Sequence, residues 1–558
     1  MKHKTSKNKQ KNESSILENT HHVPSPFSRA MDALQDRYVY VAICVAGFLL
    51  YARTIFFDFT YFDDNVLILN NLPFLQNISN VLTAFRLEVF HVLHSSAAYY
   101  RPLLTISFMP DAMLGGVDAT MYHITNILLH LIASCLVYKL LRSLGYHKSI
   151  STWSSLFFVV HPVLTQAVAW IPGRNDSLLA VFVLASFISL IRYTRDGRMR
   201  SLMLCAAFFL AALFTKESAL VMPVLFFLYL WIHGALNRQV VLKLGGMFGV
   251  SAILWATARH FALVNPIPMT PLQMVQSVYN NAPAAMQLLG KVFFPVNLSV
   301  LPIIQDTTFI WGILACVVVI SLFVWEHSRF EAGRRKNLIM MYFGLLWFLI
   351  FLFPSFIRPN PSIVADFIEH RLYIPMIGLV ILLMESRLSK VFTSRADNVG
   401  HIVVGSITII FSILTVVHSS NFSNRLIFWR NAAETSPHSP LAQRNLGAMY
   451  FLDGLYDLAE KHTLESLALN PEEQMAHNNL GLIYMQKGDL ARAEKEYLQE
   501  LAINPSYDNA HFNLGLLYYN VGRIQEAIRL WEKTLEINPD YRDAQDAIQN
   551  AKNTRSTP

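Results

Sequence analysis

Two adjacent carboxylates, Asp63 and Asp64, stand in an aromatic-rich segment that directly follows the first long apolar run of the chain. The segment from Phe57 to Asn71 reads FDFTYFDDNVLILNN. If the preceding run crosses a membrane, the pair lies at the membrane surface, where a carboxylate can take a proton from an attacking hydroxyl. The structural alternative is that the pair only caps a surface helix. We treat Asp63 and Asp64 as the candidate catalytic residues.

Further polar side chains recur near the ends of later apolar runs, in the motifs YYRPLL, VVHPVLTQAV, PGRNDS, FTKESA and IEHRLYIP. Such groups are costly at membrane depth and are usually functional. Arginine and lysine bind phosphate by charge-assisted hydrogen bonds, so these motifs predict a site for a carrier phosphate or a sugar. The candidates are Arg101, His161, Arg174, Asp176, Lys216, Glu217, Glu369, His370 and Arg371. As alternatives, Arg101 and Arg371 anchor the chain at lipid headgroups, and Lys216 pairs with Glu217.

Metal binding is left open by the sequence. His123 and His130 lie seven residues apart on one helical face, but two histidines without a third ligand more often serve packing or hydrogen bonding. A divalent ion held by Asp63 and Asp64 is a second possibility. No cofactor is assigned.

The elements that must position these residues follow from the composition. The 558 residues are 53% hydrophobic and only 15% charged, which predicts a polytopic membrane protein. The net charge of +7 gathers in the N-terminal tail and in short loops between apolar runs, where membrane topology requires cations, so nucleic acid is not an expected partner. Residues 1–37 are predicted to be a disordered cytoplasmic tail.

The positive-inside rule predicts about 11 spans within residues 38–420, with a large outer loop over 58–120. The first of them runs from Val39 to about Phe57. The segments Leu103–Leu114 and Met286–Ile304 are expected to be interfacial or re-entrant. This topology leaves the N-terminus in the cytoplasm. It places the Asp63 loop and the C-terminal tail together on the extracytoplasmic face, which is the periplasm or cell exterior, or the endoplasmic reticulum lumen in a eukaryote.

The tail after residue 420 carries an internal repeat. Asn-Leu-Gly triplets begin at Asn445, Asn479 and Asn513, a spacing of 34 that is typical of tetratricopeptide repeats. The prediction is therefore an all-α chain, a membrane helical bundle followed by a soluble α-solenoid. Its segments are a connecting half-repeat helix over 421–437, repeats over 438–471, 472–505 and 506–539, and a closing helix within the remainder of 438–558.

The three asparagines occupy equivalent places on the first helices of the repeats. They suggest a ladder of amides that bonds the backbone of an extended acceptor polypeptide, a pattern that resembles the superhelix of O-GlcNAc transferase. The alternative is that Asn is merely common before this Leu-Gly. Asn445, Asn479 and Asn513 are the candidate acceptor-binding residues.

Taken together, the motifs resemble a known family. FDD, YRPLL, HxxNILLH over His123 to His130, FxVHPVxTxAVxWIxGRxD, the KES step and EHRLYIP, followed by the repeats, are similar to the transmembrane and tetratricopeptide repeat-containing O-mannosyltransferases. These belong to the C-type glycosyltransferase (GT-C) superfamily, together with the protein O-mannosyltransferases. The likeness extends from about residue 40 to about residue 550.

The resemblance implies inverting transfer of mannose or another hexose from a polyprenyl-phosphate carrier to Ser or Thr hydroxyls of extracytoplasmic proteins. Asp63 or Asp64 would be the catalytic carboxylate, and the cationic motifs would surround the carrier phosphate or the sugar. The implied partners are the polyprenyl-phosphate-linked sugar, an acceptor polypeptide at the repeats, and membrane lipid.

Two other functions stay open at this point. The membrane body can be a non-enzymatic scaffold or a lipid transporter whose repeats recruit protein partners. Transporters place polar residues near the membrane midplane on broken helices, whereas carboxylates on one outer face favour an enzyme. A transferase of the same fold that acts on a lipid or glycan is the third hypothesis, against which the repeats argue.

Overall fold

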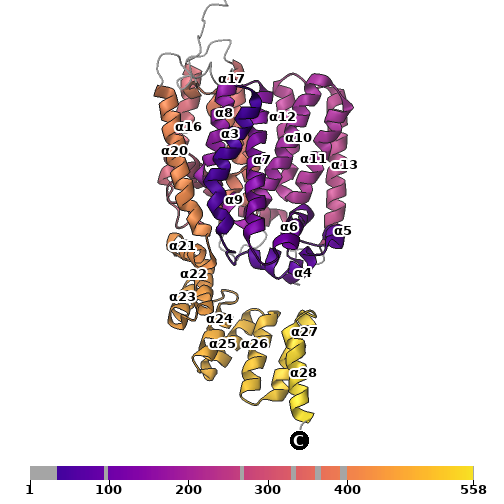
Figure 1. The fold of residues 1–558 in the computed structure, drawn as a ribbon, viewed down its shortest axis with the longest axis vertical. Helices are drawn as coiled ribbons and strands as arrows, with labels where there is room; N and C mark the ends of the chain where they lie inside the picture. The colour runs from indigo at the N-terminus through magenta and orange to yellow at the C-terminus, as the bar shows by residue number, and fades with distance from the viewer. Residues whose placement is uncertain are drawn as a thin grey trace, which may run out of the picture.

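The structure is a computed structural model that describes residues 34–93, 99–263, 269–328, 335–358, 366–389 and 399–556. Within these residues the secondary structure is helical, and the only pairing of extended chain is an isolated bridge between Ile303 and Asp366. Figure 1 shows a bundle of long, roughly parallel helices and, beyond one end of it, a curved row of short helix pairs. This confirms the all-α prediction of a membrane bundle and a solenoid.

The long helices of the bundle are α3, α7, α10, α13, α16, α17 and α20, with shorter helices between them. α3 packs on α7 and α8, and α17 packs on α18. The bounds are α3 Asp36–Tyr51, α7 Thr120–Leu144, α8 Lys148–Val160, α10 Arg174–Asp196, α11 Met199–Thr215, α12 Met222–Ile232, α13 Arg238–Ala262, α14 Pro271–Asn281, α15 Ala284–Phe293, α16 Ile310–Ser328, α17 Arg335–Leu352, α18 Pro375–Glu385 and α20 Val399–Ser419.

Seven helices in the described ranges are long and apolar enough to cross a membrane. Four further apolar helices are shorter, namely Met199–Thr215, Glu217–Ile232, Ala284–Phe293 and Pro375–Glu385. The figure of about 11 spans therefore stays a prediction, as do the side on which each end lies and the boundaries of the domains. The expected disordered tail falls almost wholly on residues 1–33, outside the described ranges.

Local sequence explains where several of these helices end. α7 stops at Leu144 because Gly145 takes a left-handed conformation with φ of 97°, which a side chain would disfavour. The short segments behave as their composition suggests. α6 covers only Pro102–Gly115, and α15 ends at Phe293 with non-helical chain up to Ile304.

The segment after the first helix forms a small subdomain at one end of the bundle. It contains a π-helical turn over Asn65–Leu69, the short helices α4 (Leu72–Leu75) and α5 (Val81–Ala84), and α6. Buried apolar side chains such as Leu67, Ile68 and Phe108 form its own core. Figure 1 shows α4, α5 and α6 at the end of the bundle that faces the repeats.

The C-terminal row consists of α21 Arg425–Thr435, α22 Pro440–Leu452, α23 Tyr456–Leu469, α24 Ala476–Gln486, α25 Leu490–Ile503, α26 Asp508–Asn520, α27 Ile524–Ile537 and α28 Arg542–Ser556. Each repeat is one antiparallel pair of helices. A glycine that recurs every 34 residues allows the two helices of a pair to pack closely. A Cβ on Gly481 would lie 2.5 Å from the Tyr497 ring, and one on Gly515 would lie 2.5 Å from the Trp531 indole. The glycines are therefore required by the aromatic side chains that fill each pair.

Helix α21 fastens the repeats to the bundle through hydrogen bonds. Trp429 Nε1 donates to the carbonyl of Thr60 at 3.1 Å, and Ser436 Oγ donates to the carbonyl of Leu301 at 2.7 Å. At the far end of the row, Asp540, Arg542 and Gln545 face α4 and its flanking residues across a cavity of about 480 Å³. The repeats thus approach the bundle at two separate places.

Candidate active site

The loop that carries Asp63 is held by aromatic packing. Phe62 stacks on Trp170, with ring centroids 5.6 Å apart, and meets Trp429 of α21 edge-on at 5.3 Å. Tyr61 has a positive φ of 57°, a conformation that non-glycine residues adopt rarely and that is often found at functional sites. The aromatic contacts therefore hold the backbone beside Asp63 in a conformation that is unfavourable for an isolated chain.

Asp63 and Asp64 have different surroundings. Asp63 is half-buried and lines a cavity of about 550 Å³, here called the Asp63 cavity. Asp64 is fully buried outside that lining, and its Oδ2 accepts hydrogen bonds from the backbone N–H of Thr60 at 2.8 Å and from the Thr60 hydroxyl. Trp170 Nε1 donates to the same hydroxyl at 3.1 Å. Asp64 therefore braces the loop, whereas Asp63 faces open space.

Burial raises the pKa of Asp63 to about 7. The negative charges of Asp64 and Asp366 add to this rise, and the guanidinium groups of Arg101 and Arg371 oppose it. Burial also raises the pKa of Asp64, to about 6, against the effect of its hydrogen bonds from Thr60. A carboxylate whose pKa lies near neutrality is suited to accept a proton at physiological pH.

Four cationic side chains stand beside Asp63. Arg101, Lys216, Arg358 and Arg371 line the Asp63 cavity and also a second cavity of about 550 Å³, which we call the Arg259 cavity after a residue found only there. These four residues, named here the cation ring, form a boundary common to the two cavities. The Arg259 cavity is otherwise mainly apolar, with Leu179, Leu220, Val221, Met269, Met274, Phe351, Phe353, Ile374 and Pro375 in its wall.

Members of the cation ring form ion pairs with carboxylates of the protein. Arg101 donates from Nε and Nη2 to Oε2 of Glu217, both at 3.1 Å, and Lys216 Nζ lies 2.7 Å from Asp176. The expected alternative, a Lys216–Glu217 pair, is not the arrangement in the structure. Burial lowers the pKa of Lys216, and Asp176 opposes that effect.

Asp366 holds the other two cations. Arg371 Nη2 lies 3.0 Å from Asp366 Oδ1, and Arg358 forms a close ion pair with the same oxygen. Burial raises the pKa of Asp366, but the charges of Arg358 and Arg371 outweigh it, so the pKa is lowered and the carboxylate is ionised. His370 also lines the Asp63 cavity, and its ring lies 5.5 Å from that of Trp170.

Arg174 is placed away from both cavities. It is fully buried, and its guanidinium is occupied by protein groups: the Asp111 carboxylate at 2.6 Å, Asn126 Oδ1 at 2.7 Å, and the carbonyls of Ser107 and Tyr122 at 2.7 Å each. With its donors used in this way, Arg174 joins α6, α7 and α10 and has no group directed at a substrate.

His161 and Glu369 are likewise structural in this arrangement. His161 is buried, with Nε2 3.1 Å from the carbonyl of Val292. Glu369 is fully buried, 2.7 Å from Lys291 Nζ and 3.2 Å from His418 Nε2. Of the nine candidate substrate-binding residues, the structure thus brings Arg101, Asp176, Lys216, Glu217, His370 and Arg371 to the two cavities, and not Arg174, His161 or Glu369.

Sequence reasoning missed Arg358 and Asp366 altogether. Arg358 and Asp366 stand on either side of the proline-containing segment 359–365, which precedes EHRLYIP. Two opposite charges placed in this way could have indicated an ion pair. It also missed Arg444 of the first repeat, which lines the Asp63 cavity. Its position directly before Asn445 gave no hint, because the prediction concentrated on the repeated asparagine.

The candidate metal ligands do not assemble into a metal centre within the part of the chain described. No three His, Cys, Asp or Glu side chains gather there in a way that suits a metal ion. His130 instead contacts the Tyr373 hydroxyl at 2.7 Å.

The asparagines of the repeats lie half-buried on α22, α24 and α26. Asn513 Nδ2 donates to Asn478 Oδ1 of the preceding repeat at 2.9 Å, and Asn445 Oδ1 accepts a long hydrogen bond of 3.4 Å from Arg444. Their role toward an acceptor stays a prediction.

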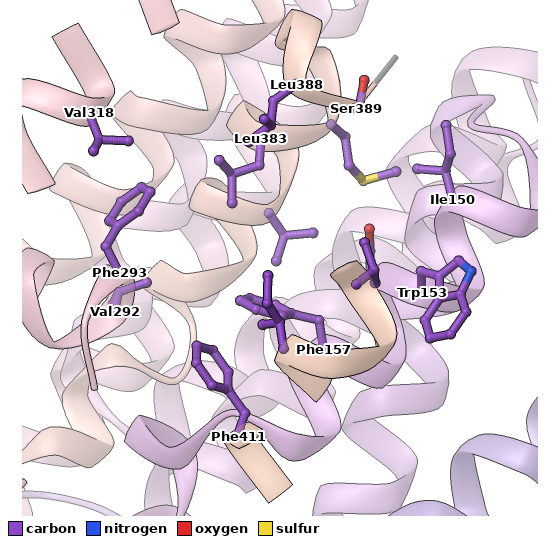
Figure 2. A pocket seen from close by; sticks show the side chains of 15 residues that line it. Ile150, Trp153, Phe157, Val292, Phe293, Val318, Leu383, Leu388, Ser389 and Phe411 are labelled. Atoms are coloured by element: carbon purple, nitrogen blue, oxygen red, sulfur yellow. The ribbon is translucent and has the colours of Figure 1, made fainter. Parts of the chain in front are cut away.

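A separate cavity, of about 320 Å³, lies among α8, α15, α16, α18 and α20 and is almost wholly apolar (Figure 2). Phe157, Phe293 and Phe411 point into it in Figure 2. Its lining shares no residue with the other two cavities, and such a surface suits hydrocarbon and not the polar chemistry of the cation ring.

Comparison with known proteins gives matches in both parts of the chain. Residues 107–258 match the family described as dolichyl-phosphate-mannose-protein mannosyltransferase. Residues 481–522 match a TPR repeat family, and residues 509–541 match the tetratricopeptide repeat. These matches confirm the resemblance predicted from the motifs.

Two curated relatives extend the similarity. Protein O-mannosyl-transferase Tmtc2 of Drosophila melanogaster is 30% identical over 54% of this chain and 33% of its own length. Protein O-mannosyl-transferase F38B6.6 of Caenorhabditis elegans is 25% identical over 74% of this chain and 60% of its own length. This chain therefore spans about a third and three fifths of these relatives. A solved repeat structure, the first TPR of Spaghetti (RPAP3) with an HSP90 peptide, is 23% identical over 21% of this chain and 94% of that chain, with a TM-score of only 0.21.

Proposed function

We propose, from the similarity of this chain to proteins named protein O-mannosyl-transferases, that it is a membrane glycosyltransferase. It moves mannose or another hexose from a polyprenyl-phosphate carrier to a Ser or Thr hydroxyl of a protein. The reaction takes place on the extracytoplasmic face, the repeats contribute to acceptor binding, and the N-terminus is cytoplasmic. The observation that carries the proposal is the position of Asp63 in one cavity with the cation ring.

The cation ring is proposed to hold the carrier phosphate. The Arg259 cavity offers a mainly apolar wall for the first part of a lipid chain, and the ring offers Arg101, Lys216, Arg358 and Arg371 for the phosphate at its boundary with the Asp63 cavity. Each cation also has a carboxylate partner, which fixes the orientation of its N–H donors. A phosphate that accepts hydrogen bonds from these donors is therefore held in a defined position.

Asp63 is proposed as the general base. The acceptor oxygen attacks the anomeric carbon and gives its proton to the Asp63 carboxylate, while the bond between that carbon and the carrier phosphate oxygen breaks. The phosphate leaves with the electron pair, and its new charge is stabilised by the cation ring. A single displacement of this kind inverts the anomeric configuration. Asp64 acts as a positioning residue through Thr60.

The first test is Asp63→Asn in the full-length protein reconstituted in membranes, assayed with a radiolabelled polyprenyl-phosphate mannose and a Thr-containing peptide. Loss of the base is expected to lower kcat/KM by about 10²- to 10⁴-fold. Asp58→Asn is the matched control, because Asp58 is an exposed carboxylate in the same loop. Equal activity of Asp63→Asn and Asp58→Asn contradicts the assignment of Asp63 as the general base. The scaffold or lipid-transporter hypothesis would then be favoured.

The acceptor class is tested by offering lipid and glycan acceptors in the same assay. The repeats border the Asp63 cavity, which supports a polypeptide acceptor. Transfer to lipid or glycan but not to any peptide would replace this part of the proposal and leave the role of Asp63 intact.

A further inference from the structure

The first repeat forms one wall of the Asp63 cavity. On the membrane side the lining includes Asp63 and the cation ring, and on the opposite side it comes from α22 and from the loop between α23 and α24. The repeat residues in the lining are Leu441, Arg444, Asn470, Glu472, Glu473 and Gln474. An acceptor that reaches Asp63 from the solvent side therefore meets this loop directly.

Arg444 lies at this wall, at a position that differs in each of the three repeats. The residue before Asn-Leu-Gly is Arg444 in the first repeat, Asn478 in the second and Phe512 in the third. Arg444 is only 9% exposed, its Nη1 lies 3.2 Å from Glu473 and donates to the carbonyl of Gln474 at 2.7 Å, and its buried Nε has no partner. This cation ties the loop to α22.

The loop from Asn470 to Met475 is itself unusual. Helix α24 begins at Ala476, two residues later than the register of α22 and α26 would place it. Met475 has a positive φ of 70°, a conformation disfavoured for a side chain, and the fully buried carboxylate of Glu500 holds it by accepting from its N–H at 2.8 Å. The first turn expected for α24 is therefore replaced by a loop with a defined conformation.

The charges on the two walls are opposite. The membrane wall carries the cation ring, while the loop presents Glu472, which is exposed and enters no ion pair within the described part of the chain. Glu473 is engaged by Arg444, so Glu472 is the free carboxylate of this wall. An acidic acceptor segment would compete with a carrier phosphate for the cation ring, and Glu472 repels such a segment while attracting a basic one.

We propose that the loop Asn470–Met475 is the acceptor subsite of the Asp63 cavity, and that Glu472 selects polypeptide segments with Lys or Arg beside the receiving hydroxyl. This inference rests on the proposed function for its chemical meaning. It assigns acceptor choice to the loop between the first and second repeats, which is longer than the corresponding loops before α26 and α28. Any contact of the solenoid with longer stretches of the acceptor is additional.

The test measures binding and transfer separately on the full-length protein in lipid nanodiscs. Two fluorescent nine-residue peptides with one Thr are compared, one with Lys and one with Glu on both sides of the Thr. Wild type is expected to bind the Lys peptide about three- to fivefold more tightly, the range for a partly exposed charge pair. Glu472→Lys is expected to reverse the order, and Glu472→Gln to abolish the difference.

Glu532→Lys is the matched control, because Glu532 is an exposed carboxylate on α27 outside the cavity, and the same charge change there leaves the preference unchanged. Higher salt is expected to shrink the wild-type preference. An unchanged ranking in Glu472→Lys overturns the inference. Binding that reverses as expected, with no transfer to either peptide, supports the acceptor subsite and overturns the proposed function instead.

Discussion

Asp63 and Asp64 are chemically identical neighbours that the fold separates into two roles. Thr60 donates to one oxygen of Asp64, whereas Asp63 faces the cavity, and Tyr61 in the same loop has a positive φ. The sequence identified the pair, because carboxylates after a membrane helix are conspicuous, but it did not separate them. That separation depends on contacts with Trp170 and Trp429, which are distant in the chain. The same holds for Arg174, because its partners Asp111, Asn126 and two backbone carbonyls come from helices distant in the chain.

The pH dependence of transfer follows from the environment of Asp63. A general base acts when it has lost its proton, and the pKa of Asp63 is raised to about 7. We therefore expect kcat/KM to fall about tenfold per pH unit below 7 and to level off above it. The measurement is the initial rate of peptide modification across this range, with peptide binding measured in parallel. A flat profile with unchanged binding contradicts the role of Asp63.

The same shift predicts an effect on stability. The folded protein keeps the Asp63 proton up to about pH 7, whereas the unfolded chain releases it near the ordinary value for aspartate, so ionisation lowers stability as the pH rises through this window. Asp63→Asn is expected to unfold at a higher temperature than wild type at pH 8, with the difference shrinking toward pH 5. This readout is independent of activity.

At the scale of elements, the presence of tetratricopeptide repeats was predictable because their spacing is a local and periodic property. The helices α23, α25 and α27 begin 34 residues apart, and α21 precedes the three pairs. What the period could not reveal is the loop before α24, where one repeat departs from the others, or the bonds of α21 to Thr60 and Leu301. Glu369 shows the same limit, since the motif EHRLYIP marks it as polar but not as buried beside Lys291.

The buried pair of Lys291 and Glu369 joins α15 to the EHRLYIP segment, and His418 brings α20 to the same carboxylate. Lys291→Met removes the lysine partner of the buried Glu369, and breaking a buried ion pair typically costs about 3–5 kcal/mol. We expect a clear drop in the unfolding temperature in detergent, followed by intrinsic fluorescence. The double variant with Glu369→Leu should recover part of the loss, and Lys461→Met, at an exposed pair, should change little. A wild-type unfolding temperature in Lys291→Met contradicts this account.

At the scale of the whole molecule, the subdomain containing α4 to α6 and the repeats lie at the same end of the bundle (Figure 1). The positive-inside rule predicts that both parts lie on one side of the membrane, and this stays a prediction. The number of crossings also stays a prediction, because it depends on short helices such as α11 and α18.

Sidedness is tested by cysteine labelling in a background without the four native cysteines. Ser79→Cys and Lys533→Cys, both at exposed positions, are expected to react with a membrane-impermeant maleimide from the same, extracytoplasmic side. Arg198→Cys, in the turn between α10 and α11, is expected to react only after the membrane is permeabilised. Labelling of positions 79 and 533 from opposite sides would contradict the arrangement.

The two places at which the repeats approach the bundle have a consequence for evolution. Ordinary repeat arrays gain and lose units readily, because each unit meets only its neighbours. Here α21 is bonded to the bundle, and the corner around Asp540 faces α4 across a cavity, so the stretch between them must bridge one particular distance. An added or deleted unit inside that stretch would carry the corner away from α4. We therefore expect the number of repeats between the two places to be constrained by geometry, so that change in this stretch occurs by substitution within the existing units.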